Sequence, residues 1–146
     1  MVAPDDEEPT MATSTIHLNF RGDARAALDH YRDVFGGEVA AFTYGQAQDP
    51  RNPDTEQIVF GELRGARGVH VMAYDVPPSM PFERGTNAMF VSVRSADAEE
   101  IAGYWGRLAS SGEVVVELGP SGWSPLYGMV ADRFGIVWVL DVVSGA

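Results

Sequence analysis

The chain has 146 residues, a length that suits one folded domain with its own hydrophobic core. Its net charge is −11, from 10 basic and 21 acidic residues, and no basic stripe is present, which argues against a nucleic-acid partner. It contains no cysteine, which excludes disulfides and thiolate metal sites, and no apolar run approaches the ~20 residues that cross a bilayer. We therefore expect a cytoplasmic protein without a nucleic-acid or membrane partner.

The chain divides into a tail and two similar modules. Residues 1–13 hold two prolines and four consecutive acids, which predicts a flexible acidic tail. A single domain is then predicted over residues 14–143. It consists of module one at 14–75, a linker with three prolines at 76–86, and module two at 87–143.

Module one has the pattern of a β-α-β-β-β unit. Ile16, Leu18 and Phe20 alternate with polar residues, which is the period of a half-buried strand. Asp23 is then predicted to be the N-cap of a helix over 24–35. A polar loop with two prolines over 46–56 separates the later strands. These strands are predicted over 39–44, 58–63 and 69–74.

Module two repeats the same order. A strand is predicted over 89–93 and a helix over 98–109, and three strands are predicted over 114–118, 127–131 and 136–142. In both modules the helix is followed by Gly-Glu-Val, at Gly37–Val39 and at Gly112–Val114. A repeat of this length indicates a duplicated supersecondary unit, so the predicted fold class is α+β with two tandem β-α-β-β-β modules.

Several short motifs occur in an order and at a spacing that match one known family. They are Asn19–Gly22, Ala26–Tyr31, Phe35–Val39, Phe42–Gly45, Gly122–Trp123 and Tyr127–Trp138. With these motifs the chain closely resembles the glyoxalase/bleomycin resistance/dioxygenase superfamily, also called vicinal oxygen chelate (VOC), and within it the PhnB-like branch. The resemblance covers about residues 15–143.

The resemblance implies a fold in which the two modules form curved sheets that line a cleft, and many members of this family are homodimers. Members range from isomerases and dioxygenases to proteins that sequester drugs, so the fold leaves the function open. Many members bind a divalent metal through His, Gln or Glu side chains on the first and third strands of each module.

The family's metal positions are only half filled in this sequence. In module one, His17 and Glu62 match or lie close to the ligand positions. In module two, the resemblance places the ligand positions on or near Ala88 and on Val139, which cannot bind a metal, and Asp141 would require a shift in register. Two ligands bind a metal weakly, so we predict no metal site and no cofactor, with a divalent metal as the alternative.

The predicted strands are rich in aromatic residues and methionine, which suits a cleft for a planar or hydrophobic small molecule. His70 alternates with core positions on its strand and is a further candidate for ligand contact. Trp123 lies in a Gly/Pro-rich loop rather than on a core face, which favours ligand contact. The predicted ligand-binding residues are His17, Tyr44, Glu62, Met72, Trp123 and Trp138, and no catalytic residue is identified.

We therefore predict a homodimeric small-molecule-binding protein with a hydrophobic and aromatic cleft. The alternative is a divalent-metal-dependent lyase, isomerase or dioxygenase that acts on vicinal oxygens of a small substrate, with His17 and Glu62 in the metal shell. A structural or regulatory dimer without a ligand is a third hypothesis. The sequence does not name the ligand.

Overall fold

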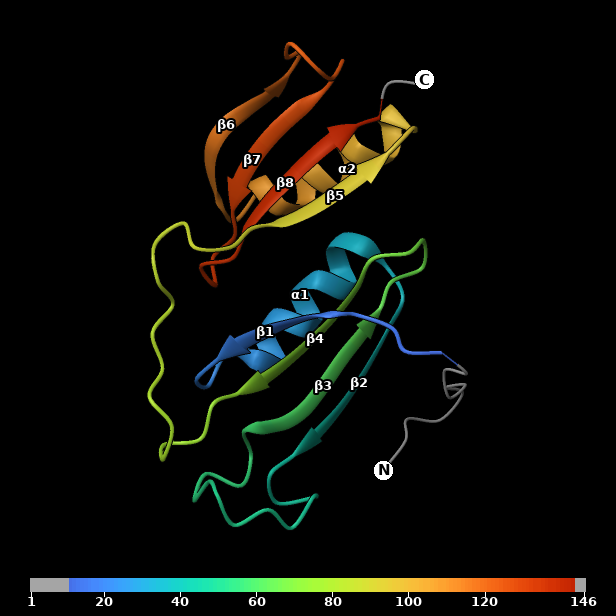
Figure 1. The fold of residues 1–146 in the computed structure, drawn as a ribbon. Helices are drawn as coiled ribbons and strands as arrows, with labels where there is room; N and C mark the ends of the chain where they lie inside the picture. The colour runs from blue at the N-terminus through green and yellow to red at the C-terminus, as the bar shows by residue number, and fades with distance from the viewer. Residues whose placement is uncertain (1–10, 144–146) are drawn as a thin grey trace. The chain divides into compact units, whose positions relative to one another are not determined.

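The computed structural model describes residues 11–143 and shows the β-α-β-β-β order twice (Figure 1). The predicted α+β fold with tandem modules is therefore confirmed. Most of the predicted tail, residues 1–10, lies outside the described residues, as do residues 144–146. The elements are β1 Ile16–Phe20, α1 Ala24–Phe35, β2 Glu38–Thr43, β3 Ile58–Arg64, β4 His70–Asp75, β5 Val91–Ser95, α2 Ala98–Ala109, β6 Glu113–Gly119, β7 Tyr127–Ala131 and β8 Val137–Val142.

Both helices have the bounds that the sequence predicts, because apolar residues at helical spacing mark them clearly. The largest difference from the predicted strands is at β5, which begins at Val91 rather than Met89. Met89 is 74% exposed, so its apolar side chain does not belong to a strand that packs on a core. No helix among residues 11–143 is both long enough and apolar enough to span a membrane.

The two sheets have the same topology. The first has the strand order β1-β4-β3-β2 and the second has the order β5-β8-β7-β6. In each sheet the outer pair β1–β4 or β5–β8 is parallel, and the other neighbours are antiparallel. Each parallel pair joins strands that are distant in the chain, which a helix crossover makes possible.

The chain forms two compact units that differ slightly from the predicted modules. Of the described residues, 11–32 and 36–82 form unit 1, and 33–35 and 83–143 form unit 2. The first part of the predicted linker belongs to unit 1, because Arg21 binds main-chain oxygens in it. The guanidinium of Arg21 donates to Val76 O at 3.3 Å, to Pro77 O at 3.2 Å and to Met80 O.

In unit 1, a buried carboxylate rather than a local N-cap holds the start of α1. Asp23 occupies the N-cap position that the sequence predicts, and its main-chain oxygen accepts from Ala27 N at 2.8 Å, but its side chain makes no capping hydrogen bond. Asp75, at the end of β4 and 1% exposed, accepts hydrogen bonds from Gly22 N at 2.6 Å and Ala24 N at 3.1 Å. Its other oxygen accepts one from Ile58 N at 2.9 Å, so one side chain joins three segments of the unit.

Unit 2 uses a local cap instead. Asp97 accepts hydrogen bonds from Glu99 N at 3.0 Å and Glu100 N at 3.3 Å. This is the ordinary side-chain cap at the start of a helix. The core of unit 2 is centred on Trp138, which is fully buried and packs against Phe35 with ring centroids 5.0 Å apart.

A glycine at the same register position in each sheet admits a helix side chain. A Cβ on Gly61 in β3 would lie 2.5 Å from Leu28 Cδ1 of α1. A Cβ on Gly128 in β7 would lie 2.7 Å from a ring carbon of Trp105 of α2. These contacts identify the face of each sheet that packs on its helix.

Candidate functional site

The face of the first sheet that points away from α1 carries most of the predicted site residues, and we call it the far face of unit 1. Along each strand its side chains alternate with the buried ones that pack on the helix, such as Leu18, Leu63 and Val71. The far face consists of His17 and Asn19 on β1, His70, Met72 and Tyr74 on β4, Phe60, Glu62 and Arg64 on β3, and Phe42 on β2.

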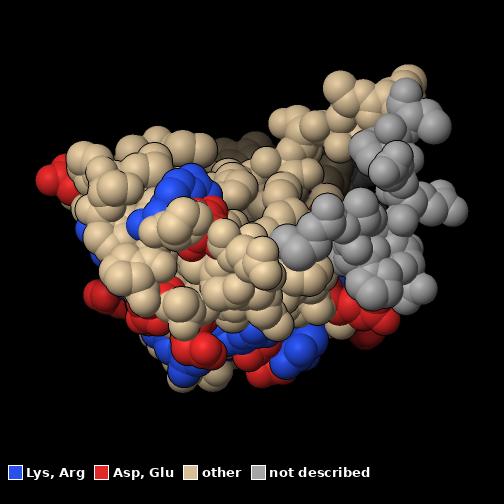
Figure 2. Space-filling model, turned by 90° about the horizontal axis from the view of Figure 1, so that it is seen from below, with Lys and Arg blue, Asp and Glu red and all other residues tan. Residues whose placement is uncertain are grey.

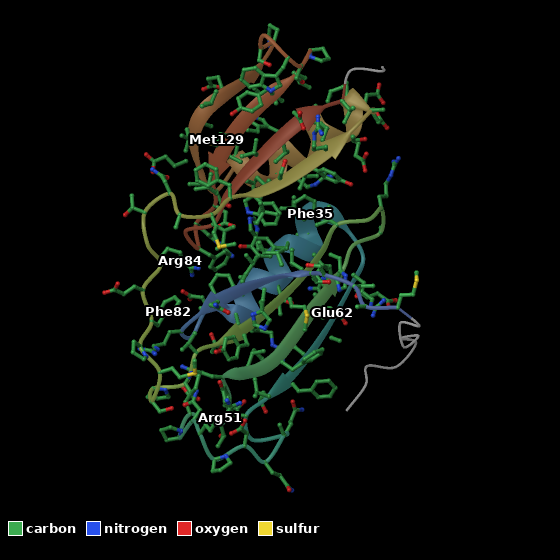
Figure 3. The ribbon with its side chains drawn as sticks, viewed as in Figure 1. Phe35, Arg51, Glu62, Phe82, Arg84 and Met129 are labelled. Carbon is green, nitrogen blue, oxygen red and sulfur yellow. The ribbon has the colours of Figure 1, made fainter. Side chains whose placement is uncertain are left out.

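Three predicted residues form one row across this face. His17 on β1 is the register partner of Met72 on β4, and Met72 is the register partner of Glu62 on β3. Figure 3 labels Glu62 on this strand. Register partners on neighbouring strands present their side chains to the same face, so the strands bring together residues that are up to 55 positions apart in the sequence.

His17 is held at the edge of the row. Its Nδ1 lies 2.9 Å from Asn19 Oδ1, and its ring meets that of Tyr74 edge to face, with centroids 5.1 Å apart. The alternation of His70, Met72 and Tyr74 along one strand predicts that Tyr74 shares this face, although the predicted ligand-binding residues do not include it. Asn19 was not among the predicted site residues.

Glu62 is the most buried charge on the far face, at 7% exposed. Its Oε2 lies 2.6 Å from His70 Nε2, and its Oε1 accepts a hydrogen bond from Arg64 Nε at 3.4 Å. The other ring nitrogen of His70 lies 3.4 Å from Thr15 Oγ1. The result is a chain from carboxylate to imidazole to hydroxyl, an arrangement that orients an imidazole for hydrogen bonding or proton transfer.

Two predicted site residues lie in the core instead. Tyr44 is fully buried, and its hydroxyl donates to the main-chain oxygen of Asp75 at 2.6 Å. Burial raises the pKa of this Tyr44 hydroxyl. Trp138 is also fully buried, and its Nε1 donates to Asp132 Oδ2 at 2.9 Å. Because both polar atoms already have partners inside the protein, the structure does not place these two side chains in a ligand site.

Trp123 is exposed, as the sequence predicts for a Gly/Pro-rich loop. Its side chain is 65% exposed, and its ring contacts that of Tyr127 edge to face at 5.0 Å. It belongs to unit 2, whereas His17, Met72 and Glu62 belong to unit 1.

The side chains of the far face do not fit the metal centre that the family resemblance implies. Within residues 11–143, no group of three or more His, Cys, Asp or Glu side chains is placed to hold a metal ion. Both oxygens of Glu62 have protein partners, and Met72 lies between Glu62 and His17 in the row. A metal site of two ligands is weak, because protein sites ordinarily supply three or more.

The second sheet corrects one detail of the predicted metal positions. The counterpart of His17 is Ser92 rather than Ala88, because Ser92 pairs with Val139 on β8 as His17 pairs with Met72 on β4. Val139 occupies the last-strand position, as the sequence indicates. Asp141, the remaining candidate, forms an ion pair with Arg94 at 3.0 Å.

Several arginines of the described residues pair with neighbouring acids. Figure 2 shows blue and red side chains next to one another on the face that it presents. The pairs are Arg32–Asp29, Arg51–Asp49, Arg64–Glu62 and Arg94–Asp141. In the exposed Arg51–Asp49 pair, the hydrogen bonds from Arg51 lower the pKa of Asp49. Paired charges contribute little net positive potential for a phosphate backbone.

Comparisons with known proteins agree with this architecture. A sequence model of the Glyoxalase/Bleomycin resistance protein/Dioxygenase superfamily matches residues 16–140. The chain is 28% identical to Protein YjdN of Escherichia coli K12 over 141 residues, which cover 87% of this chain and 92% of YjdN. Among solved structures, it is similar to protein PA1353 from Pseudomonas aeruginosa, with 27% identity, a TM-score of 0.82, and coverage of 92% of this chain and 100% of that one. The fold also resembles that of a PhnB protein from Bacillus cereus, with 23% identity, a TM-score of 0.70, and coverage of 90% and 100%.

Proposed function

The chain belongs to the Glyoxalase/Bleomycin resistance protein/Dioxygenase superfamily, and on that premise we propose that it binds a small hydrophobic or aromatic molecule. We place it in the PhnB-like branch. This placement is supported by its motifs and by the likeness of its fold to that of the Bacillus cereus PhnB protein. We also propose that it acts as a homodimer, which light scattering coupled to size exclusion will test.

The row of His17, Met72 and Glu62 carries the proposal. The thioether of Met72 lies between the imidazole of His17 and the carboxylate of Glu62. A ligand in apolar contact with Met72 therefore has a hydrogen-bonding group on either side. Phe42 and Phe60 extend the apolar surface, with ring centroids 5.9 Å apart and both side chains half-buried. Small-molecule sites typically combine apolar surface of this kind with a few placed polar groups.

Ligand binding is favoured over metal-dependent catalysis because of how the two metal-donor candidates are arranged. His17 and Glu62 lie two strand spacings apart, about 10 Å between their Cα atoms. Each oxygen of Glu62 already has a hydrogen-bond partner, Arg64 for Oε1 and His70 for Oε2, and a cation would compete with these partners for the carboxylate.

The test is a ligand screen read at the methionine methyl groups by NMR. Aromatic compounds that bind at the proposed row will shift the methyl resonance of Met72, assigned by a Met72→Leu variant. Met72→Ala will weaken binding about tenfold, because it removes apolar contact area. Met89→Ala is the matched control, since Met89 is exposed and lies in the other unit. A broad aromatic library that shifts no methionine methyl resonance would refute the proposal.

The enzyme alternative is tested by calorimetric titration of the metal-stripped protein with Zn²⁺, Ni²⁺, Mn²⁺ and Fe²⁺. We expect no stoichiometric tight binding. Binding that is lost on combined substitution of His17→Ala and Glu62→Ala would reverse the ranking of the two functions.

A further inference from the structure

The face of the second sheet that points away from α2 has a chemistry of its own, and we call it the far face of unit 2. Val93, Val130, Trp138 and Leu140 are buried on the helix side, so the residues that alternate with them face the other way. The far face of unit 2 consists of Ser92 and Arg94 on β5, Val139 and Asp141 on β8, Tyr127 and Met129 on β7, and Val116 on β6. Figure 3 labels Met129 on this sheet.

One edge of this face carries an exposed aromatic pair. Trp123 is 65% exposed, and its ring lies 5.0 Å from that of Tyr127. The loop that carries it is fixed by hydrogen bonds. Ser121 N donates to Ser124 O at 2.9 Å, and Ser124 Oγ donates to Val142 O at 2.7 Å. The loop that carries the exposed indole is therefore held in place by hydrogen bonds.

Arg94 lies on the opposite edge. Its Nε donates to Asp141 Oδ1 at 3.0 Å and to Oδ2 at 3.3 Å. Within residues 11–143, no side chain or main-chain atom accepts a hydrogen bond from its two terminal amino groups. Asp141 thus orients the guanidinium, and four N–H donors remain for a partner from outside the unit.

We propose that the far face of unit 2 binds a planar aromatic ligand that carries an acceptor oxygen, with its ring against Trp123 and its oxygen on Arg94. This inference rests on the proposed small-molecule-binding function and adds a second binding face, in unit 2, with its ligand class and residues. Met129 and Val139 supply half-buried apolar surface next to Tyr127, and Asp141, the ion-pair partner of Arg94, lies between Arg94 and Tyr127 in the register.

Arg94 and Tyr127 lie on strands β5 and β7, with β8 between them, so their Cα atoms are about 10 Å apart. We therefore test the proposal with probes of two fused rings that carry one oxygen substituent.

The corresponding row of unit 1 does not have this chemistry. By register, Asn19 takes the place of Arg94, and Glu62 takes the place of Met129. Among the described residues, a guanidinium oriented by a carboxylate therefore occurs at this register position in unit 2 and not in unit 1.

The experiment uses the whole chain and three probes: 2-naphthoate, neutral 2-acetonaphthone, and naphthalene, which lacks the oxygen. Indole N–H resonances report on the site, because all three tryptophans lie in unit 2. We expect the oxygen-bearing probes to shift the Trp123 resonance and to leave that of Trp138 in place, since its indole N–H is buried on Asp132. The methyl group of Met129 should shift together with Trp123.

Two substitutions separate the ring contact from the oxygen contact. Trp123→Ala will weaken the binding of all three probes about tenfold, and the folded core should stay intact because the side chain that is removed is 65% exposed. Arg94→Met will weaken the binding of both oxygen-bearing probes about tenfold and leave the affinity for naphthalene unchanged. The substitution keeps the apolar part of the side chain and removes the N–H donors. Arg133→Met is the matched control, since it removes the same charge from an exposed position of unit 2.

The outcomes are distinct. Equal affinity for naphthalene and the two oxygen-bearing probes, or equal losses in Arg94→Met and Arg133→Met, overturns the inference. Shifts at Met72 without shifts at Trp123 and Met129 also overturn it but leave the proposed function in place. Shifts at neither methionine overturn both. Binding of 2-naphthoate alone among the probes assigns the site to carboxylates, and binding of both oxygen-bearing probes assigns it to carbonyl acceptors in general.

Discussion

Asp75→Asn is expected to be one of the most damaging conservative substitutions in unit 1. The carboxylate is 1% exposed and accepts hydrogen bonds from three main-chain N–H groups, those of Gly22, Ala24 and Ile58. An asparagine of the same shape keeps one acceptor oxygen and turns an NH₂ group toward at least one of these donors. That N–H loses its partner inside the protein.

The magnitude follows from the hydrogen bonds. An unsatisfied buried N–H costs about 1–3 kcal/mol, and the remaining two bonds lose the assistance of the charge. We expect the free energy of unfolding to fall by about 3 kcal/mol. With a urea m-value of about 2 kcal/mol per molar, the midpoint shifts down by about 1.5 M.

The N-cap residues of the two helices provide internal controls. Asp97→Ala should cost about 1 kcal/mol, because Asp97 caps α2 through Glu99 N and Glu100 N. Asp23→Ala should cost less than about 0.5 kcal/mol, because its side chain caps nothing.

Urea unfolding at pH 7 is followed by far-ultraviolet circular dichroism, since tryptophan fluorescence reports on unit 2 alone. The reasoning is refuted if Asp75→Asn lies within 0.5 kcal/mol of the unsubstituted protein. It also fails if Asp23→Ala costs as much as Asp97→Ala.

Three further substitutions test the packing and the hydrogen bonds. Gly61→Ala should lower stability by about 1–3 kcal/mol, because its Cβ would overlap a leucine of α1, whereas Gly119→Ala meets nothing within 4 Å and should be near neutral in the same urea assay. Tyr44→Phe should cost about 1 kcal/mol at pH 7. Because burial raises the pKa of Tyr44, its contribution to stability is complete below pH 10 and is lost as the pH rises through the raised value. The melting temperature, measured from pH 8 to 11, should therefore fall less steeply in Tyr44→Phe than in the unsubstituted protein. His70→Ala should cost about 1–3 kcal/mol by leaving the buried Glu62 without its 2.6 Å partner, and no loss in thermal unfolding at pH 7 would contradict that role.

Much of the fold could be read from the sequence because local patterns carry it. The alternation of Ile16, Leu18 and Phe20 and the helical spacing in the two helices define the elements and their buried faces. β5 was predicted two residues early because Met89 and Phe90 are apolar but exposed, and a hydrophobic pattern does not distinguish exposed residues from buried ones.

The site was predicted less completely. Alternation along a strand fixes which face a side chain occupies, and the structure places the predicted residues His17, Met72 and Glu62 on one face. The contact between His70 and Glu62 was not predicted, because the two lie diagonally on neighbouring strands and only the register of β3 against β4 brings them together. Tyr44 shows the converse error, in which an aromatic residue at a plausible site position is used in the core.

The sequence by itself determined the duplicated β-α-β-β-β order, the bounds of both helices and the side of each strand that is buried, because these depend on neighbours a few residues away. Only the tertiary structure decided that Asp75 rather than Asp23 holds α1, that Trp138 is enclosed, and that Arg94 is oriented by Asp141. Each of these depends on strand register between segments distant in the chain, and a one-residue slip in register would give every side chain different partners.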